Sequence, residues 1–199
     1  MKRFITLLFT LYVVLLQPLA ADASYFPSTQ ITDNKEAAYC ASTPVFTTAA
    51  SATDIFNFKG SGTKTVYVRR IYWRQSIYTA ANTTHNAYLV KRSTANSGGT
   101  SSAITAVPLD SNFSSATASG VYYTANPSSL GTSVGTIAHT WVNGSSAPIN
   151  QPGMALFDST KGGSPIVLRG TSESVSVNFN GVTDAIGTSA TVDIEWSEK

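Results

Sequence analysis

Residues 190–197 (ATVDIEWS) decide the fold class of this 199-residue chain. Every second residue in them is apolar, and the residues between are polar. Alternation with a period of two is typical of a β-strand that buries one face and leaves the other in water. Residues 174–179 (SVSVNF) alternate in the same way, and the turn dipeptide Asn180-Gly181 follows them. Two half-buried strands separated by a turn signal predict antiparallel β structure.

Working outward, residues 64–73 (KTVYVRRIYW) form a long strand candidate whose apolar residues change parity at Arg69-Arg70. A β-bulge at this dipeptide would return the apolar residues on both sides of it to one face, so we predict one there. Further strands are expected at residues 45–47, 54–58, 86–92, 121–124, 136–142, 154–157 and 166–169. No amphipathic helical period occurs after the N-terminal apolar run. The sequence therefore predicts an all-β fold, an antiparallel β-sandwich with jelly-roll-like connectivity.

The composition fits this fold and excludes some functions. Charged residues make up only 12% of the chain, whereas Ser and Thr contribute 26 residues each. Thr favours strands and Ser favours turns, so these residues supply the polar surface of a β protein. Thirteen basic and eleven acidic residues leave a net charge of +2. So small an excess gives little attraction to phosphate chains, and we expect no nucleic-acid partner.

The N-terminus has the pattern of an export signal. Met1-Lys2-Arg3 is a short basic start, residues 4–16 (FITLLFTLYVVLL) are apolar, and Ala21-Asp22-Ala23 provides a small-x-small cleavage site. We expect a signal peptide at residues 1–23, an extended arm at 24–52 and a β-sandwich domain at 53–199. Export would make the chain secreted, periplasmic or cell-surface, with no integral membrane segment in the mature form. The alternative is an uncleaved N-terminal helix that acts as an anchor or packing element.

Residues suited to catalysis are sparse. The chain has one cysteine, Cys40, and two histidines, with no spacing that indicates a metal site, so we expect no metal and no cofactor. Residues 131–135 (GTSVG) match the G-x-S-x-G pattern of hydrolases around Ser133, but a strand candidate follows them where that motif requires a helix. His139 is the only histidine downstream, with no acidic residue between it and Ser133. We therefore expect a protein that is not an enzyme.

The region between residues 93 and 133 is weakly hydrophobic and rich in turn residues, which is typical of long exposed loops that carry binding. A connection without any partner would have the same composition. The aromatic content of 11% offers further contact residues. Our candidates for contact with a ligand or partner are Tyr122, Tyr123, Trp141, Asn96, Asp110 and Asn112.

Three segments carry a resemblance to a known group of proteins: residues 89–100 (LVKRSTANSGGT), 106–111 (AVPLDS) and 123–127 (YTANP). In them the chain resembles virion-associated β-rich proteins encoded by tailed phages and prophages, of decoration or surface type. The resemblance extends over most of the chain after about residue 50. It implies a β-rich structural or decorating role, and the group offers no catalytic motif to carry over.

These observations support three hypotheses. The first is a non-catalytic structural or adhesive β-sandwich module like a phage surface or decoration protein, acting through contacts with a protein partner or with further copies of itself. The virion would then be the alternative location. The second is a secreted carbohydrate-binding module with a glycan as its partner, and the third is a serine hydrolase at Ser133.

Overall fold

The computed structural model describes residues 36–77, 84–143, 149–150, 154–181 and 189–199. They contain fourteen strands: β1 (Ala37–Ser42), β2 (Phe46–Thr47), β3 (Asp54–Lys59), β4 (Thr65–Ile77), β5 (Thr84–Arg92), β6 (Thr100–Ala103), β7 (Val107–Pro108), β8 (Ser119–Ala125), β9 (Ser133–Asn143), β10 (Ile149–Asn150), β11 (Met154–Asp158), β12 (Ile166–Arg169), β13 (Ser174–Asn178) and β14 (Ser189–Glu198). One short 3-10 turn, η2 (Ser159–Lys161), follows β11. No helix in the described residues is long and apolar enough to cross a membrane.

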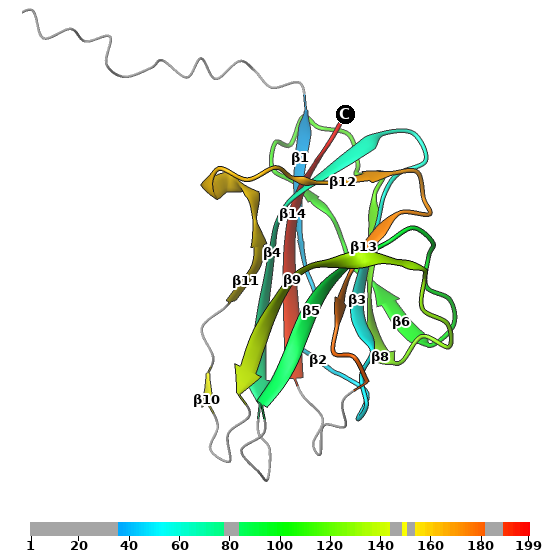
Figure 1. The fold of residues 1–199 in the computed structure, drawn as a ribbon. Coiled ribbons are helices and arrows are strands. Elements are labelled where there is room, and N and C mark those ends of the chain that lie inside the picture. The colour runs from blue at the N-terminus through cyan, green and yellow to red at the C-terminus, as the bar shows by residue number, and fades with distance from the viewer. Residues whose placement is uncertain (1–35, 78–83, 144–148, 151–153, 182–188) are drawn as a thin grey trace, which may run out of the picture. The chain divides into compact units, whose positions relative to one another are not determined.

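The strands form two antiparallel sheets that pack against each other (Figure 1). The eight-stranded sheet has the order β10-β4-β14-β1-β7, with β11 and β12 also paired to β4 and β2 to β14. The six-stranded sheet has the order β6-β8-β3-β13-β5-β9. The expected all-β antiparallel sandwich is confirmed, while its jelly-roll connectivity stays a prediction.

The predicted β-bulge in β4 is present. Arg70 pairs with Glu195, but the next pair along β14 joins Val68 to Trp196, so Arg69 is the extra residue. The bulge places the apolar residues on both sides of it in the core, and Val66, Val68, Ile71 and Trp73 are all buried. An irregular ladder thus restores one continuous apolar face to a strand whose sequence lacks strict alternation.

Large aromatic side chains fill the space between the sheets. Trp196 lies 4.8 Å from Phe58 and 5.5 Å from Tyr39, measured between ring centroids. Trp73 meets Phe179 edge-on at 5.3 Å. Each such side chain contributes about 1.5–3 kcal/mol by leaving water, with a further ~1 kcal/mol from favourable ring geometry. The core therefore joins residues from β1, β3, β4 and β14 with the end of β13.

Two strands come from the segment in which the sequence predicts an extended arm. β1 pairs with β14 over Ala37–Ser42, so the first and last strands lie side by side (Figure 1). Tyr39 is fully buried, and its hydroxyl donates to the Ser114 carbonyl at 2.8 Å. Phe46 of β2 is also buried. The expected signal peptide and residues 24–35 of the expected arm lie outside the described residues.

Candidate functional site

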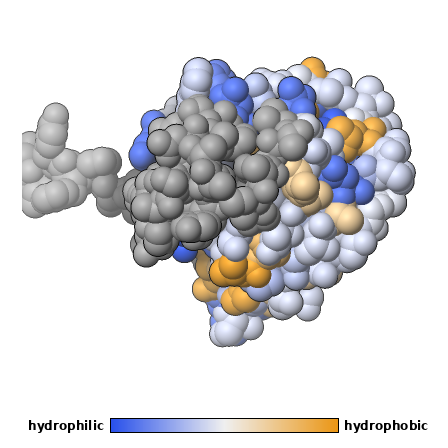
Figure 2. Space-filling view, turned by 90° about the horizontal axis from the view of Figure 1, so that it is seen from below, coloured by the Kyte–Doolittle hydropathy of each residue, from blue (hydrophilic) through white to orange (hydrophobic). Residues whose placement is uncertain are grey.

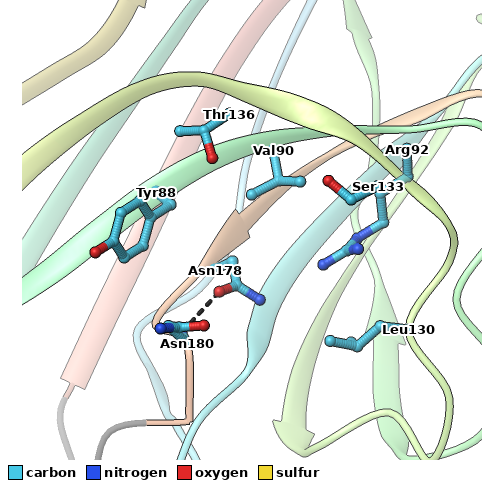
Figure 3. Close-up of a pocket in the computed structure, with 8 residues that line it drawn as sticks. All are labelled: Tyr88, Val90, Arg92, Leu130, Ser133, Thr136, Asn178 and Asn180. Atoms are coloured by element: carbon cyan, nitrogen blue, oxygen red, sulfur yellow. Dashed lines mark hydrogen bonds between the residues drawn. The ribbon is translucent and has the colours of Figure 1, made fainter.

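A groove of about 420 Å³ opens on the outer face of the six-stranded sheet (Figure 3). It lies over β5 and β9 and over the chain where β13 ends. Figure 3 shows Tyr88 at one end of the groove and Ser133 with Arg92 at the other. Its lining consists of Tyr88, Val90, Arg92, Leu130, Ser133, Thr136, Asn178 and Asn180.

The outer face of β13, beside the groove, is more deeply buried than the sequence predicts. The alternation of residues 174–179 predicts a wet polar face, and this prediction is wrong, because all five residues of β13 are buried. The Asn57 side-chain amide, on neighbouring β3, donates to both Ser174 Oγ (2.9 Å) and Ser176 Oγ (2.8 Å). Alternation indicates which residues share a face, but it says nothing of neighbouring strands and loops that bury that face.

Asp54 is the centre of a buried polar cluster at the edge of the groove. Arg92 binds its carboxylate with two parallel bonds, Nε to Oδ2 (2.8 Å) and Nη2 to Oδ1 (2.7 Å). Asn96 donates to Oδ2 at 2.7 Å and Asn178 to Oδ1 at 2.5 Å. The side chains of Asp54 and Arg92 are 0% and 5% exposed. This bidentate geometry is the strongest form of ion pair, and here it removes both charges from solvent.

The same cluster fixes the two loops that follow β5 and β8. Arg92 Nη1 donates to the Gly131 carbonyl (2.7 Å), and the Gly131 N–H donates to Asn96 Oδ1 (2.8 Å). Ser97 and Ser129 exchange backbone hydrogen bonds further along the loops. Gly131 is required here, because a Cβ would lie 1.8 Å from the Thr94 carbonyl oxygen. The loops are thus joined to each other and to the sheet.

Four side chains in the groove remain available for binding. Tyr88, Ser133 and Thr136 carry hydroxyls and Asn180 carries an amide, and none of these groups has a hydrogen-bond partner in the part of the chain that the structure describes. The other polar side chains of the lining are engaged, since Arg92 binds Asp54 and Asn178 accepts the Asn180 N–H at 2.6 Å (Figure 3). Val90 and Leu130 add apolar surface.

Exposed apolar side chains gather along the same edge of the sheet. Of the seven large hydrophobic residues exposed in the described chain, four lie between residues 130 and 141. Trp141 is the largest and is 64% exposed. Trp141 pairs with Asn86, and His139 pairs with Tyr88. The side chains of these two cross-strand pairs therefore belong to the outer face of the sheet. Figure 2 shows the molecule from below, and the orange apolar areas visible from this side are small and separate.

The six contact residues expected from the sequence occupy different environments. Asn96 and Tyr123 are buried and meet in the Asp54 cluster. Burial raises the pKa of the Tyr123 hydroxyl, and the negative charge of Asp54 raises this pKa further, whereas a hydrogen bond with Asn96 lowers it. Tyr122 points to the opposite face and packs on Phe46, with ring centroids 4.8 Å apart.

The remaining three contact candidates are exposed. Asp110 and Asn112 share a turn in which the Asn112 N–H donates to Asp110 Oδ1 at 2.9 Å. Only Trp141 lies exposed near the groove, on β9. Sequence reasoning did not select Thr136 or Asn180 as contact residues, although the Asn180-Gly181 turn signal was a usable hint. Asn180 is the one described non-glycine residue with positive φ (58°).

The hydrolase-like motif has a different geometry from that of a hydrolase. Ser133 is the first residue of β9, an edge strand, and no helix follows it. His139 lies six residues along the same strand, which separates the two residues by roughly 20 Å. Within the described residues, no three side chains of His, Cys, Asp or Glu are grouped to hold a metal ion.

A second buried carboxylate lies at the end of the other sheet. Glu198 accepts the Thr117 hydroxyl (2.6 Å), the Ala118 N–H (2.9 Å) and the Trp196 indole N–H (3.1 Å). Burial alone would raise the pKa of Glu198, but these hydrogen bonds outweigh it and hold the pKa below its usual value. Glu198 binds the segment before β8 to the last strand of the fold.

Comparison with known proteins adds no relative, since no family model, no curated protein and no solved structure matches the chain.

Proposed function

We propose that this chain is a non-catalytic β-sandwich module of adhesive or structural type, like a phage surface or decoration protein. It acts by contact alone, through the groove and the exposed residues of β9. The observation that carries the proposal is the groove itself, with four polar groups that have no hydrogen-bond partner among the described residues, beside Trp141, which is 64% exposed. The composition also supports it, because aromatic anchors combined with Ser, Thr and Asn are typical of surfaces that bind by contact.

Rigidity supports the same proposal. The Asp54 cluster holds the loops at residues 93–99 and 126–132 against the sheet, so the walls of the groove are formed before any ligand arrives. A preformed site loses little conformational entropy on binding. Contacts through so small a surface are individually weak, and several copies on one particle or cell surface would bind together with much higher avidity.

In this proposal, the cellular location of the protein is inferred from its sequence. Export through the N-terminal apolar segment would bring the module to the periplasm, the cell surface or the medium. The resemblance to phage-encoded proteins makes a virion surface the alternative location. In both places a rigid module with its contact face outward can be displayed in many copies.

Adhesion to cells tests the proposal. The full chain without residues 1–23 is biotinylated, loaded on streptavidin beads and mixed with intact bacterial cells of several species, and bound beads are counted by flow cytometry. We expect Trp141→Ala to lower binding about tenfold, because a loss at one contact is multiplied over several. Leu109→Ala is the matched control, since Leu109 is also exposed (56%) but follows β7 of the other sheet.

Three results would contradict the proposal. The first is failure of the wild-type beads to bind any of the cells, and the second is equal binding by the Trp141 and Leu109 variants. The third is covalent labelling of Ser133 by a serine-directed fluorophosphonate probe, which would indicate an activated nucleophile and hence a hydrolase.

A further inference from the structure

We propose that the groove binds a neutral glycan, with its sugar units between Tyr88 and Ser133 and a neighbouring unit of the same chain on Trp141. This inference rests on the proposed adhesive function and names its ligand. It follows from the charge of the groove, the chemistry of its free groups and the placement of its aromatic side chains.

The described residues of the groove offer no free charge. Its one ionic side chain, Arg92, is 5% exposed and bound to Asp54, which is 0% exposed. Arg92 also donates to the Gly131 carbonyl. No other lining residue that the structure describes is charged at neutral pH. A phosphate, sulfate or carboxylate in the groove would therefore lose hydration without gaining an ion pair, and a neutral ligand is favoured.

The free polar groups match sugar hydroxyls. The hydroxyls of Tyr88, Ser133 and Thr136 each donate and accept, and the Asn180 amide does both through separate atoms. A sugar hydroxyl also donates and accepts, so each pairing can be satisfied in either direction. Because the four groups come from β5, β9 and the turn after β13, they surround a ligand from two sides of the groove (Figure 3).

The backbone that carries the Asn180 amide is held in place before binding. Its backbone has the left-handed conformation (φ 58°), which asparagine tolerates better than most residues, and Gly181 after it continues the turn (φ 69°). Asn178 Oδ1 accepts the Asn180 N–H, and the Gly181 N–H donates to the Ala52 carbonyl. The turn thus fixes the backbone position from which the Asn180 side chain reaches the groove.

Aromatic placement suits a chain of sugars. Sugar rings have an apolar C–H face that stacks on indole and phenol rings. Tyr88 pairs with His139 and Asn86 with Trp141, so Tyr88 and Trp141 are diagonal neighbours on one face, ~7–8 Å apart at the backbone. Two aromatic rings at this separation can hold successive sugar units. Trp141 has no other evident reason for its exposure within the described structure.

The test is a printed array of neutral oligosaccharides together with sulfated and sialylated forms of the same chains. The probe is the chain without residues 1–23, and hits are confirmed by calorimetry. We expect binding to neutral glycans that does not change between about 50 and 500 mM salt, because no ion pair forms. Binding restricted to the charged glycans, strong salt dependence or no binding to any neutral glycan would overturn the inference.

Variants connect the binding to the groove. Tyr88→Phe and Ser133→Ala should each weaken glycan binding about three- to tenfold by removing one hydrogen bond, and Trp141→Ala by a similar or larger factor. Ser101→Ala is the matched control for Ser133→Ala, because Ser101 is an exposed serine on β6, the opposite edge strand of the same sheet. Equal affinities of these two variants would place the glycan elsewhere and overturn the inference.

The outcomes separate this inference from the proposed function. If cells bind through Trp141 but no neutral glycan does, and protease treatment of the cells abolishes adhesion, the partner is a protein; the glycan inference is then wrong and the adhesive function stands. If the wild-type chain binds neither cells nor glycans, both are wrong.

Discussion

Asp54 and Glu198 are two fully buried carboxylates, one in each sheet, and they are satisfied in different ways. Asp54 is balanced by a complete opposite charge, the bidentate guanidinium of Arg92. Glu198 is balanced mainly by neutral donors from Thr117, Ala118 and Trp196. Its nearest cation, Lys64, is 3.8 Å away and 30% exposed.

The two carboxylates differ in their effect on the charge of the groove. By binding Arg92 in the interior, Asp54 neutralises the one ionic side chain among the described lining residues of the groove. Glu198 does not line the groove, and its donors Thr117 and Ala118 belong to a segment that it attaches to β14. In the glycan site proposed above, the Asp54 cluster would therefore act on ligand chemistry as well as on stability, whereas Glu198 would act on stability alone.

We expect Arg92→Ala to lower the free energy of unfolding more than Glu198→Gln or Arg74→Ala. This variant leaves the Asp54 carboxylate buried without a counter-charge, and breaking a buried pair in this way costs about 3–5 kcal/mol in the free energy of unfolding. Urea denaturation followed by tryptophan fluorescence measures it. The double variant Asp54→Ala/Arg92→Ala removes both charges and should be less destabilised than the sum of the two single variants.

If Arg92→Ala lowered the free energy of unfolding by less than about 1 kcal/mol, the contrast between Asp54 and Glu198 would be wrong. It would mean that Asn96 and Asn178 can satisfy the carboxylate unaided, so that Asp54 and Glu198 would both depend on neutral donors. Strict additivity in the double variant would have the same meaning.

A smaller effect is expected from Glu198→Gln, about 2 kcal/mol near neutral pH, because hydrogen bonds to a charged acceptor are lost. Since the folded-state pKa of Glu198 is lowered, its charged form stabilises the fold at every pH above the unfolded-state pKa of about 4.3. This contribution is lost as the pH falls through the lower folded-state pKa. The stability difference between wild type and Glu198→Gln should therefore shrink below about pH 4.

Urea titrations of both proteins at several pH values measure that difference. A constant difference from pH 7 to pH 3 would show that the carboxylate charge contributes nothing and that Glu198 acts only through its shape.

The strands that sequence reasoning found are those with visible periodicity or β-branched and aromatic runs. Residues 190–197 and the bulge at Arg69-Arg70 are the clearest cases, because burial of one face dictates alternation. β1 was missed because its sequence, AAYCAS, has small residues on both faces and so shows no contrast. β6, β7 and β10 have only two to four residues each, too few for any period to appear.

The candidate site was harder to predict than the fold. Asp54, Arg92, Asn96 and Asn178 are scattered along the chain, and only the pairing of β13 with both β3 and β5 brings them together. Nothing in the sequence marks Arg92 as a buried cation, yet its side chain is 5% exposed and binds Asp54 and the Gly131 carbonyl. Trp141 is exposed because β9, as an edge strand, has no neighbouring strand to bury it on one side, and its role as a contact residue stays a prediction.

The smallest loss of stability is expected when an exposed ion pair is broken, and this loss is the reference against which the two buried carboxylates are compared. Arg74 Nη2 lies 3.3 Å from Asp193 Oδ2, but its side chain is 61% exposed, and Asp193 keeps a 2.6 Å bond from the Ser42 hydroxyl. Water and salt therefore replace most of what Arg74→Ala removes, and the free energy of unfolding should fall by less than about 1 kcal/mol. In 0.5 M salt the change should be smaller still. Arg92 and Arg74 both contact an aspartate of a sheet, so a cost for Arg74→Ala as large as that for Arg92→Ala would mean that burial is not what makes the Asp54 pair strong.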